Sequence, residues 1–295
     1  MSGADQSAAS EVRWFTTALS DTPIADEYRA LESALRHGRG VDCAFNPAPY
    51  PVQVLQKARE WWLAIMRSEY ESASGFVELE MQFREIDAPI DVQAVVLRMA
   101  QDELRHAAIC ANVVERLGGE AKILAPPMRR SVVHADCGLD EAVLRTVIFG
   151  CCLSETVNAA RLAKRLAYTS DPFVREAIRQ ILADERLHAQ FGFYYLESRR
   201  QWLETRPAVR NSIARYLQYG FAVLEQYMGA VPHGARSPSN LERDLGIPDL
   251  TDLSTTFQET MLNASVPGLE RFGIEAATAW RDRSIMPKVR DLPAS

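Results

Sequence analysis

The stretches Asp102-Glu103-Leu104-Arg105-His106 and Asp184-Glu185-Arg186-Leu187-His188 repeat one short motif inside two long segments with helical apolar periodicity. A helix turns once every 3.6 residues, so a glutamate and a histidine three residues apart lie close together on one face. Each copy can therefore direct a carboxylate and an imidazole toward the same point. A single pair of this kind is common on solvated helices, but two matched copies indicate a shared site.

Each motif also follows a glutamate embedded in an earlier helical segment. Glu71 lies 32 residues before Glu103, and Glu155 lies 30 residues before Glu185. These matched intervals predict two helix pairs that face each other. We expect six side chains to act as metal ligands in one buried pocket: Glu71, Glu103, His106, Glu155, Glu185 and His188.

This ligand set is typical of a carboxylate-bridged dinuclear centre inside a four-helix bundle. Glutamates suit hard ions and imidazole suits iron, so we expect two iron ions, with manganese as the second choice. The sequence has no clustered thiolates, which argues against a structural zinc site or an iron-sulfur cluster.

Three glutamates on the same segment could supply the first-helix ligand, namely Glu69, Glu71 and Glu78. Glu78 shares a face with Glu71, whereas Glu69 points elsewhere if Glu71 points inward. We choose Glu71, since its interval to the following motif matches the second pair best among the same-face candidates.

Neighbouring residues suggest further roles. A metal-bound imidazole usually donates its other N–H to a carboxylate, so we expect Asp102 to reach His188 and Asp184 to reach His106. Arg105 and Arg186 are expected as surface or snorkelling side chains, with neutralisation of surrounding carboxylates as the alternative. A substrate pocket is expected beside the small residues four positions after each ligand glutamate, although close helix packing explains them equally well. These residues are Gly75, Ala107, Ala159 and Ala189, and the two further pocket candidates are Cys151, one turn before Glu155, and Ile181, one turn before Glu185.

The chain reads as an all-α protein. The four long helices are expected at residues 51–86, 91–118, 139–168 and 172–203, bounded by Pro, Gly and Asp signals. They form a ferritin-like four-helix bundle at 57–203 within a single helical domain, 23–295, that follows a flexible tail, 1–22. Additional helices are expected near residues 23–38, 209–231 and 255–283, the last two covering the bundle in the region 207–295.

Composition limits the function. The chain has 295 residues, 47% of them hydrophobic, and a formal charge of −6, which gives no electrostatic case for nucleic acid or an anionic membrane. We find no signal pattern and expect no apolar run of membrane-spanning length. Five cysteines without a C-x-x-C motif fit a reducing compartment, so we expect a cytoplasmic protein.

The two motifs, together with Tyr70-Glu71-Ser72-Ala73 and Ser154-Glu155-Thr156, resemble the ferritin-like non-haem di-iron oxygenases and oxidases over residues 57–203. The nearest in appearance are the p-aminobenzoate N-oxygenase-type enzymes. The resemblance implies dioxygen as co-substrate and a small organic substrate of secondary metabolism, free or carrier-bound. It also implies a separate reductase or ferredoxin, since no flavin, nicotinamide or iron-sulfur motif is present. We expect a homodimer, because long exposed helices commonly pair.

One departure from that group concerns the reaction. The N-oxygenases carry an added histidine ligand one turn before the last ligand glutamate, where this chain has Ile181. N-oxygenation, hydroxylation and desaturation therefore all stay open. The rival class is a ferritin-like ferroxidase or a dimanganese peroxide-scavenging protein. A metal-free bundle is disfavoured, because it would bury four carboxylates without partners.

Overall fold

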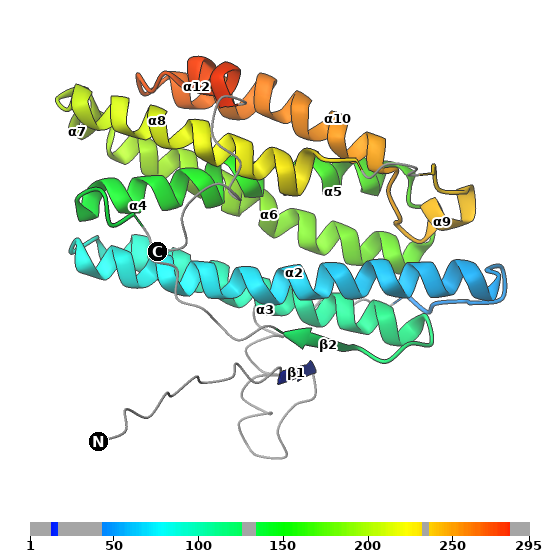
Figure 1. Cartoon of the computed structure of the whole chain (residues 1–295). Helices are drawn as coiled ribbons and strands as arrows, with labels where there is room; N and C mark the ends of the chain where they lie inside the picture. The colour runs from blue at the N-terminus through cyan, green and yellow to red at the C-terminus, as the bar shows by residue number, and fades with distance from the viewer. Residues whose placement is uncertain (1–12, 17–42, 126–133, 232–235, 284–295) are drawn as a thin grey trace, which may run out of the picture.

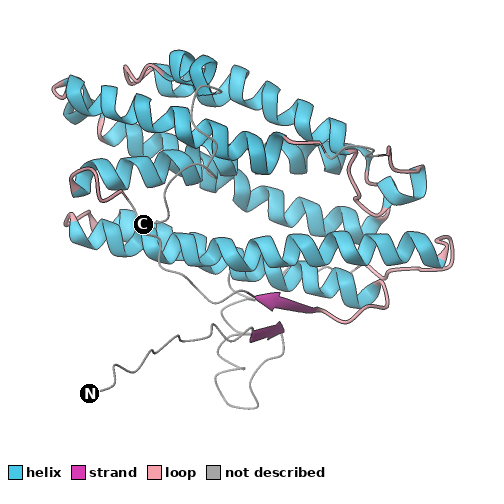
Figure 2. Cartoon of the chain, viewed as in Figure 1, coloured by secondary structure: helices cyan, strands magenta, loops and turns pink. Residues whose placement is uncertain are grey.

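The structure is a computed structural model that describes residues 13–16, 43–125, 134–231 and 236–283. These parts are mostly helical, which confirms the all-α class (Figure 2). The longest helices are α2 (Val52–Glu85), α3 (Ile90–Arg116) and α6 (Pro172–Ser198). A further helical run joins α4 (Leu139–Val147), the π-helical segment η1 (Ile148–Glu155) and α5 (Thr156–Tyr168).

The helices lie in layers along a common direction (Figure 1). Helices α2 and α3 form an antiparallel hairpin on one side and pack extensively against each other. The run α4–η1–α5 and helix α6 lie next to this hairpin, with η1 against α6. The two motif-bearing helices, α3 and α6, thus contact each other in the middle of the molecule.

Local signals explain where these helices begin and end. Pro51 and Pro89 precede α2 and α3, where a missing N–H costs nothing. The Asp171 side chain accepts a hydrogen bond from the Val174 N–H and caps α6. Between α2 and α3 the chain reverses through Asp87, whose φ of 51° is left-handed. The expected boundaries of these helices are therefore met to within a few residues.

Except for Asn240–Asp244, which contacts α2, the C-terminal part forms an additional layer on the far side of α4–α6 from the α2–α3 hairpin (Figure 1). Its helical segments are α7 (Arg200–Glu204), α8 (Pro207–Leu224), η2 (Glu225–Gly229), α9 (Asn240–Asp244), α10 (Leu250–Thr260), η3 (Met261–Ser265), α11 (Val266–Glu270) and α12 (Ala276–Asp282). The single helix expected over 255–283 is wrong, because Gly273 has a φ of +69° and interrupts it. Of these segments, α8, α10 and η3 contact the run α4–η1–α5.

Two short strands also depart from expectation. Strand β1 (Arg13–Thr16) lies inside the region expected to be a tail, and it pairs antiparallel with β2 (Lys122–Ala125) with Trp14 opposite Leu124. Four-residue strands are too short to produce a readable alternation, which is why the sequence did not reveal them. The helix expected at residues 23–38 lies outside the described residues.

The apolar core has two parts, one on each side of the motifs. One is centred on α4, η1 and the C-terminal layer, and the other on α2, the second half of α3 and the start of α6. Leu139–Tyr168 is long and apolar enough to span a membrane by length and composition, contrary to our expectation. However, 61% of its apolar window is buried inside the protein, as in the core helix of a soluble protein.

Candidate metal centre

Two groups of buried side chains meet where α3 faces α6. The first comprises Glu69, Glu103, His106 and Glu185, and the second comprises Glu103, Glu155, Glu185 and His188. Within each group, one ligand-type atom per residue lies within 4.8 Å of all the others. Glu103 and Glu185 belong to both groups, so each is placed to bridge two ions. Five of the six residues expected from the sequence are brought together here.

Glu71 is the exception, and its expected role is wrong. It is exposed on α2, and its Oε1 accepts a 2.8 Å hydrogen bond from Arg67. Glu69 takes its place in the first group. Residues two apart on a helix point in nearly opposite directions, so only one of the two can face the core. Glu78 is also outside both groups and lines the cavity described below.

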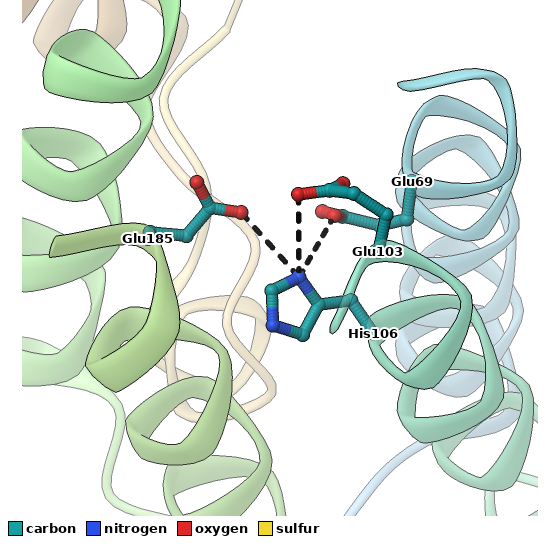
Figure 3. A group of neighbouring side chains, drawn as sticks. All are labelled: Glu69, Glu103, His106 and Glu185. Carbon is teal, nitrogen blue, oxygen red and sulfur yellow. Dashed lines mark ion pairs between the residues drawn. The ribbon is translucent and has the colours of Figure 1, made fainter. Parts of the chain in front are cut away.

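The two imidazoles direct the same ring atom toward the carboxylates. His106 Nδ1 lies 3.3 Å from Glu69, 3.5 Å from Glu185 and 3.9 Å from Glu103 (Figure 3). His188 Nδ1 lies 3.1 Å from Glu103 and 3.9 Å from Glu185. Both histidines are almost completely buried. Three carboxylates therefore lie within 4 Å of His106 Nδ1, and two lie within 4 Å of His188 Nδ1, with Glu155 in the same group.

The other ring nitrogens face the two aspartates, in the crossed arrangement expected from the sequence. His106 Nε2 lies 3.2 Å from Asp184 Oδ2, and His188 Nε2 lies 3.7 Å from Asp102 Oδ2. Each contact joins the two motif helices. Asp184 is within hydrogen-bond distance of His106 and favours the tautomer whose Nδ1 carries a free lone pair. Asp102 faces His188 from a longer distance, and His188 Nε2 has no hydrogen-bond partner in the described structure.

Arg105 links the two aspartates and is not at the surface as expected. It is 6% exposed, donates to Asp184 and lies 3.8 Å from Asp102. Asp102 also accepts hydrogen bonds of 2.9 and 3.1 Å from Arg98. Arg186, by contrast, is exposed on α6 as expected. One buried guanidinium therefore supports the aspartates of both histidines.

The pKa values reflect this crowding of charge. Burial raises the pKa of Glu69 to about 7 and that of Glu185 to about 8, and it raises the pKa of Glu155 well above its ordinary range. Burial lowers the pKa of His188, but contacts with Asp102 and Glu103 outweigh it and raise the value to about 10. In the absence of a bound cation, the site therefore disfavours the state in which all four glutamates are ionised.

The donor set fits two divalent cations. Buried atoms without a hydrogen-bond partner in the described structure include Glu103 Oε1, His106 Nδ1, Glu155 Oε2, Glu185 Oε2 and His188 Nδ1. Buried polar atoms are rarely left without partners unless an ion or water occupies the site. Four ionised carboxylates would also balance the charge of two divalent ions, and oxygen with imidazole donors suits iron or manganese.

A large cavity adjoins the second group. It has a volume of about 1140 Å³, and Glu155, Ser72 and Phe76 line it beside the cluster. Its more distant lining includes His134, Tyr216 and Arg215. A cavity of this size exceeds the volume of most small-molecule sites, so it has room for a drug-sized ligand.

Two of the six pocket candidates line this cavity, Gly75 and Cys151. Ala107 and Ile181 are buried in the apolar core, and Ala159 packs against that core. Ala189, on α6, is not among the lining residues. The four-residue spacing therefore fails for Ala107, Ala159 and Ala189, because the described cavity borders α2 and η1 and not these positions.

Residues that the sequence did not single out complete the cavity wall. Arg145 is buried and donates to Asp136, Glu141 and Ser212, which joins α4 to α8 and to the segment before α4. His134 stacks edge-on against Tyr216. These contacts join parts of the chain far apart in sequence, so no local pattern reveals them.

Comparisons of the chain with protein-family models, with curated proteins and with solved structures find no match.

Proposed function

We propose that the protein is a ferritin-like, non-haem di-iron oxygenase or oxidase that uses dioxygen to oxidise a small organic substrate. Support comes from two buried carboxylate–histidine groups that share Glu103 and Glu185 on facing helices. In this assignment Glu69 and His106 would hold one ion, Glu155 and His188 would hold the other, and Glu103 and Glu185 would contribute to both. Manganese is the second choice of metal.

One observation favours an organic substrate over iron handling, namely the 1140 Å³ cavity that reaches Glu155. A ferroxidase needs only a path for ions and dioxygen. Leu79, Phe149 and Phe76, whose ring lies edge-on to His188, line the space together with Thr146, Ser212 and Tyr216. Such a wall can hold an apolar body and orient polar substituents.

The chain's own residues would bind and orient the reactants. When bound, the metal pair supplies the redox chemistry that activates dioxygen. Asp184 would orient the His106 imidazole, Asp102 lies beside that of His188, and Phe76 lines the cavity on the same side as Glu155. The electrons come from a separate reductase or ferredoxin. We further propose a cytoplasmic homodimer with a small substrate, free or carrier-bound, and leave N-oxygenation, hydroxylation and desaturation open.

A cavity-filling variant tests this function. Gly75 lines the cavity, and a Cβ added there meets nothing within 4 Å, so Gly75→Leu should fill space without disturbing α2. After anaerobic loading with iron, we expect about two ions per chain in wild type and variant. Dioxygen uptake that is coupled to oxidation of amines, arenes or acyl compounds should be strongly reduced in the variant. Gly138→Ala, also in open space but away from the cavity lining, is the matched control.

The same experiment separates the rival function. A ferritin-like ferroxidase would oxidise iron equally fast in Gly75→Leu and would not respond to any organic substrate. A dimanganese peroxide-scavenging protein would instead decompose hydrogen peroxide when loaded with manganese. Either result would overturn the proposed oxygenase.

A further inference from the structure

A serine of the C-terminal layer holds η1, the segment that ends in the ligand Glu155. Ser265 is the last residue of η3 and is completely buried. Its Oγ donates a 3.0 Å hydrogen bond to the carbonyl oxygen of Cys152. Cys152 lies three residues before Glu155 in η1. This bond therefore ties the outer layer to the helical turn that presents the carboxylate.

A π-helical turn needs such support. Its wider ring replaces the regular α-helical hydrogen bonds, and such turns occur as short, local interruptions. Buried carbonyls in the widened turn must still find donors. Hydroxyls of the helix provide two of them, since Ser154 Oγ donates to Phe149 O at 3.0 Å and Thr156 Oγ1 donates to Cys151 O at 3.3 Å. Ser265 provides the same type of donor from another element.

Helix α6 confines the same turn from a second direction. A Cβ added at Gly192 would lie 2.7 Å from Cys151 Cβ and 2.7 Å from Cys152 Sγ. That helix also carries Glu185 and His188. Since η1 contacts both α6 and η3, its turn is fixed between a ligand-bearing helix and the C-terminal layer.

We propose that Ser265 is a positioning residue for Glu155, and that it holds the π-helical turn at the rotation in which this carboxylate meets Glu103, Glu185 and His188. The proposal rests on the proposed function only in that the cluster binds metal. It gives the C-terminal layer a second role besides covering the core. Loss of the hydroxyl should weaken the group that contains Glu155 and spare the group that contains Glu69.

The test is an anaerobic cobalt(II) titration of the metal-free protein, followed by the visible absorption of the bound ion. Wild type should bind about two ions per chain. Ser265→Ala should bind one ion normally and the other about five- to tenfold more weakly, the size expected for one hydrogen bond, with an altered spectrum for that ion. Ser254→Ala is the matched control, because Ser254 Oγ donates at 2.6 Å to Gly229 O of another π-helical segment, η2. It should bind both ions as wild type does.

Each outcome bears on the proposal. Unchanged affinities and spectrum in Ser265→Ala overturn the positioning role and leave the proposed function standing, whereas a wild type that binds no cobalt overturns both. Equal weakening in Ser254→Ala also overturns it, since general loosening would then be the cause. If Ser265→Ala does not fold, Ser265→Cys keeps a similar shape with a weaker donor. Its affinity for the second ion should be reduced, and wild-type affinity would count against the proposal.

Discussion

The two halves of the candidate metal centre share one motif but are built differently. In the first half, Glu69 lies in the middle of the regular helix α2. In the second half, Glu155 ends the π-helical segment η1 and borders the large cavity. Glu69 is not among the residues lining that cavity. The half that contains Glu155 is therefore the one that borders a substrate-sized cavity, whereas Glu69, whose side chain is 14% exposed, lies away from that cavity.

The two halves also differ in the number of residues between the first glutamate and the glutamate of the motif. Glu69 precedes Glu103 by 34 residues, whereas Glu155 precedes Glu185 by 30. The difference of four residues is close to one helical turn, so both glutamates keep the inward face. The first hairpin is thus about one turn longer than the second. A repeated motif can preserve the orientation of its ligands without preserving their exact spacing.

The largest expected effect comes from removing a residue that both halves share. Glu103→Ala deletes a ligand from each group, so we expect metal content to fall from about two ions per chain to nearly none. Metal analysis after loading with iron or manganese measures this. Glu115→Ala, an exposed glutamate on the same helix, should keep the full content. Full metal binding by Glu103→Ala would show that the two groups are not joined as described.

The next effect separates the halves. Glu69→Ala should leave about one ion per chain, because the group that contains Glu155 keeps all of its residues. Glu71→Ala should leave both ions and change the free energy of unfolding by less than about 1 kcal/mol, since it removes only an exposed pair with Arg67. The opposite pattern, with metal loss in Glu71→Ala alone, would restore the ligand chosen from the sequence.

This choice of ligand shows what the sequence can and cannot predict. The Glu-x-x-His pairs at Glu103 and Glu185 were predictable, because spacing within one helix fixes which side chains share a face. Glu69 was not, because the length of a hairpin depends on how its two helices pack. Helix α2 continues 16 residues beyond Glu69, from 69 to 85, whereas α5 continues 13 beyond Glu155, from 155 to 168. No local signal records that difference.

The same distinction holds for the fold. The limits of α2, α3 and α6 were predictable because Pro51, Pro89 and Asp171 act on their immediate neighbours. The π-helical turn at η1 was not, since it depends on contacts such as the close approach of Gly192 from another helix. Arg105 was misplaced for a related reason. Its burial depends on Asp184, which lies 79 residues further along the chain.

Arg105 provides a third prediction, on stability instead of metal content. Both halves depend on this residue, because it contacts Asp102 and Asp184 in the interior. Arg105→Ala leaves these buried carboxylates with less compensation, so we expect a loss of about 3–5 kcal/mol in the free energy of unfolding. Arg186→Ala changes the other motif's exposed arginine and should cost less than about 0.5 kcal/mol. Urea unfolding in the presence of a chelator measures both, and equal losses would contradict the asymmetry between them.

The smallest expected effect is the pH dependence of the metal-free protein. Burial raises the pKa of Glu185 from 4.5 to about 8 and that of Glu69 to about 7 in the folded state. The folded protein therefore holds more protons than the unfolded chain above pH 4.5, and stability falls as the pH rises through these values. His188 acts in the same direction between 6.5 and about 10, because its folded pKa is also raised.

Bound metal should reverse this trend, since the ligands must release their protons to coordinate it. We expect the melting temperature to decrease from pH 6 to pH 9 with a chelator and to hold or increase over that range with iron(II) or manganese(II) under anaerobic conditions. Glu69→Gln should weaken the decrease that is seen with a chelator between pH 6 and 7, because it removes a carboxyl group whose pKa is raised to about 7. Parallel curves with and without metal would show that protons and metal do not compete for these side chains. The difference in this decrease between wild type and Glu69→Gln measures the part that comes from Glu69. The remaining decrease is expected to come from Glu185, Glu155 and His188.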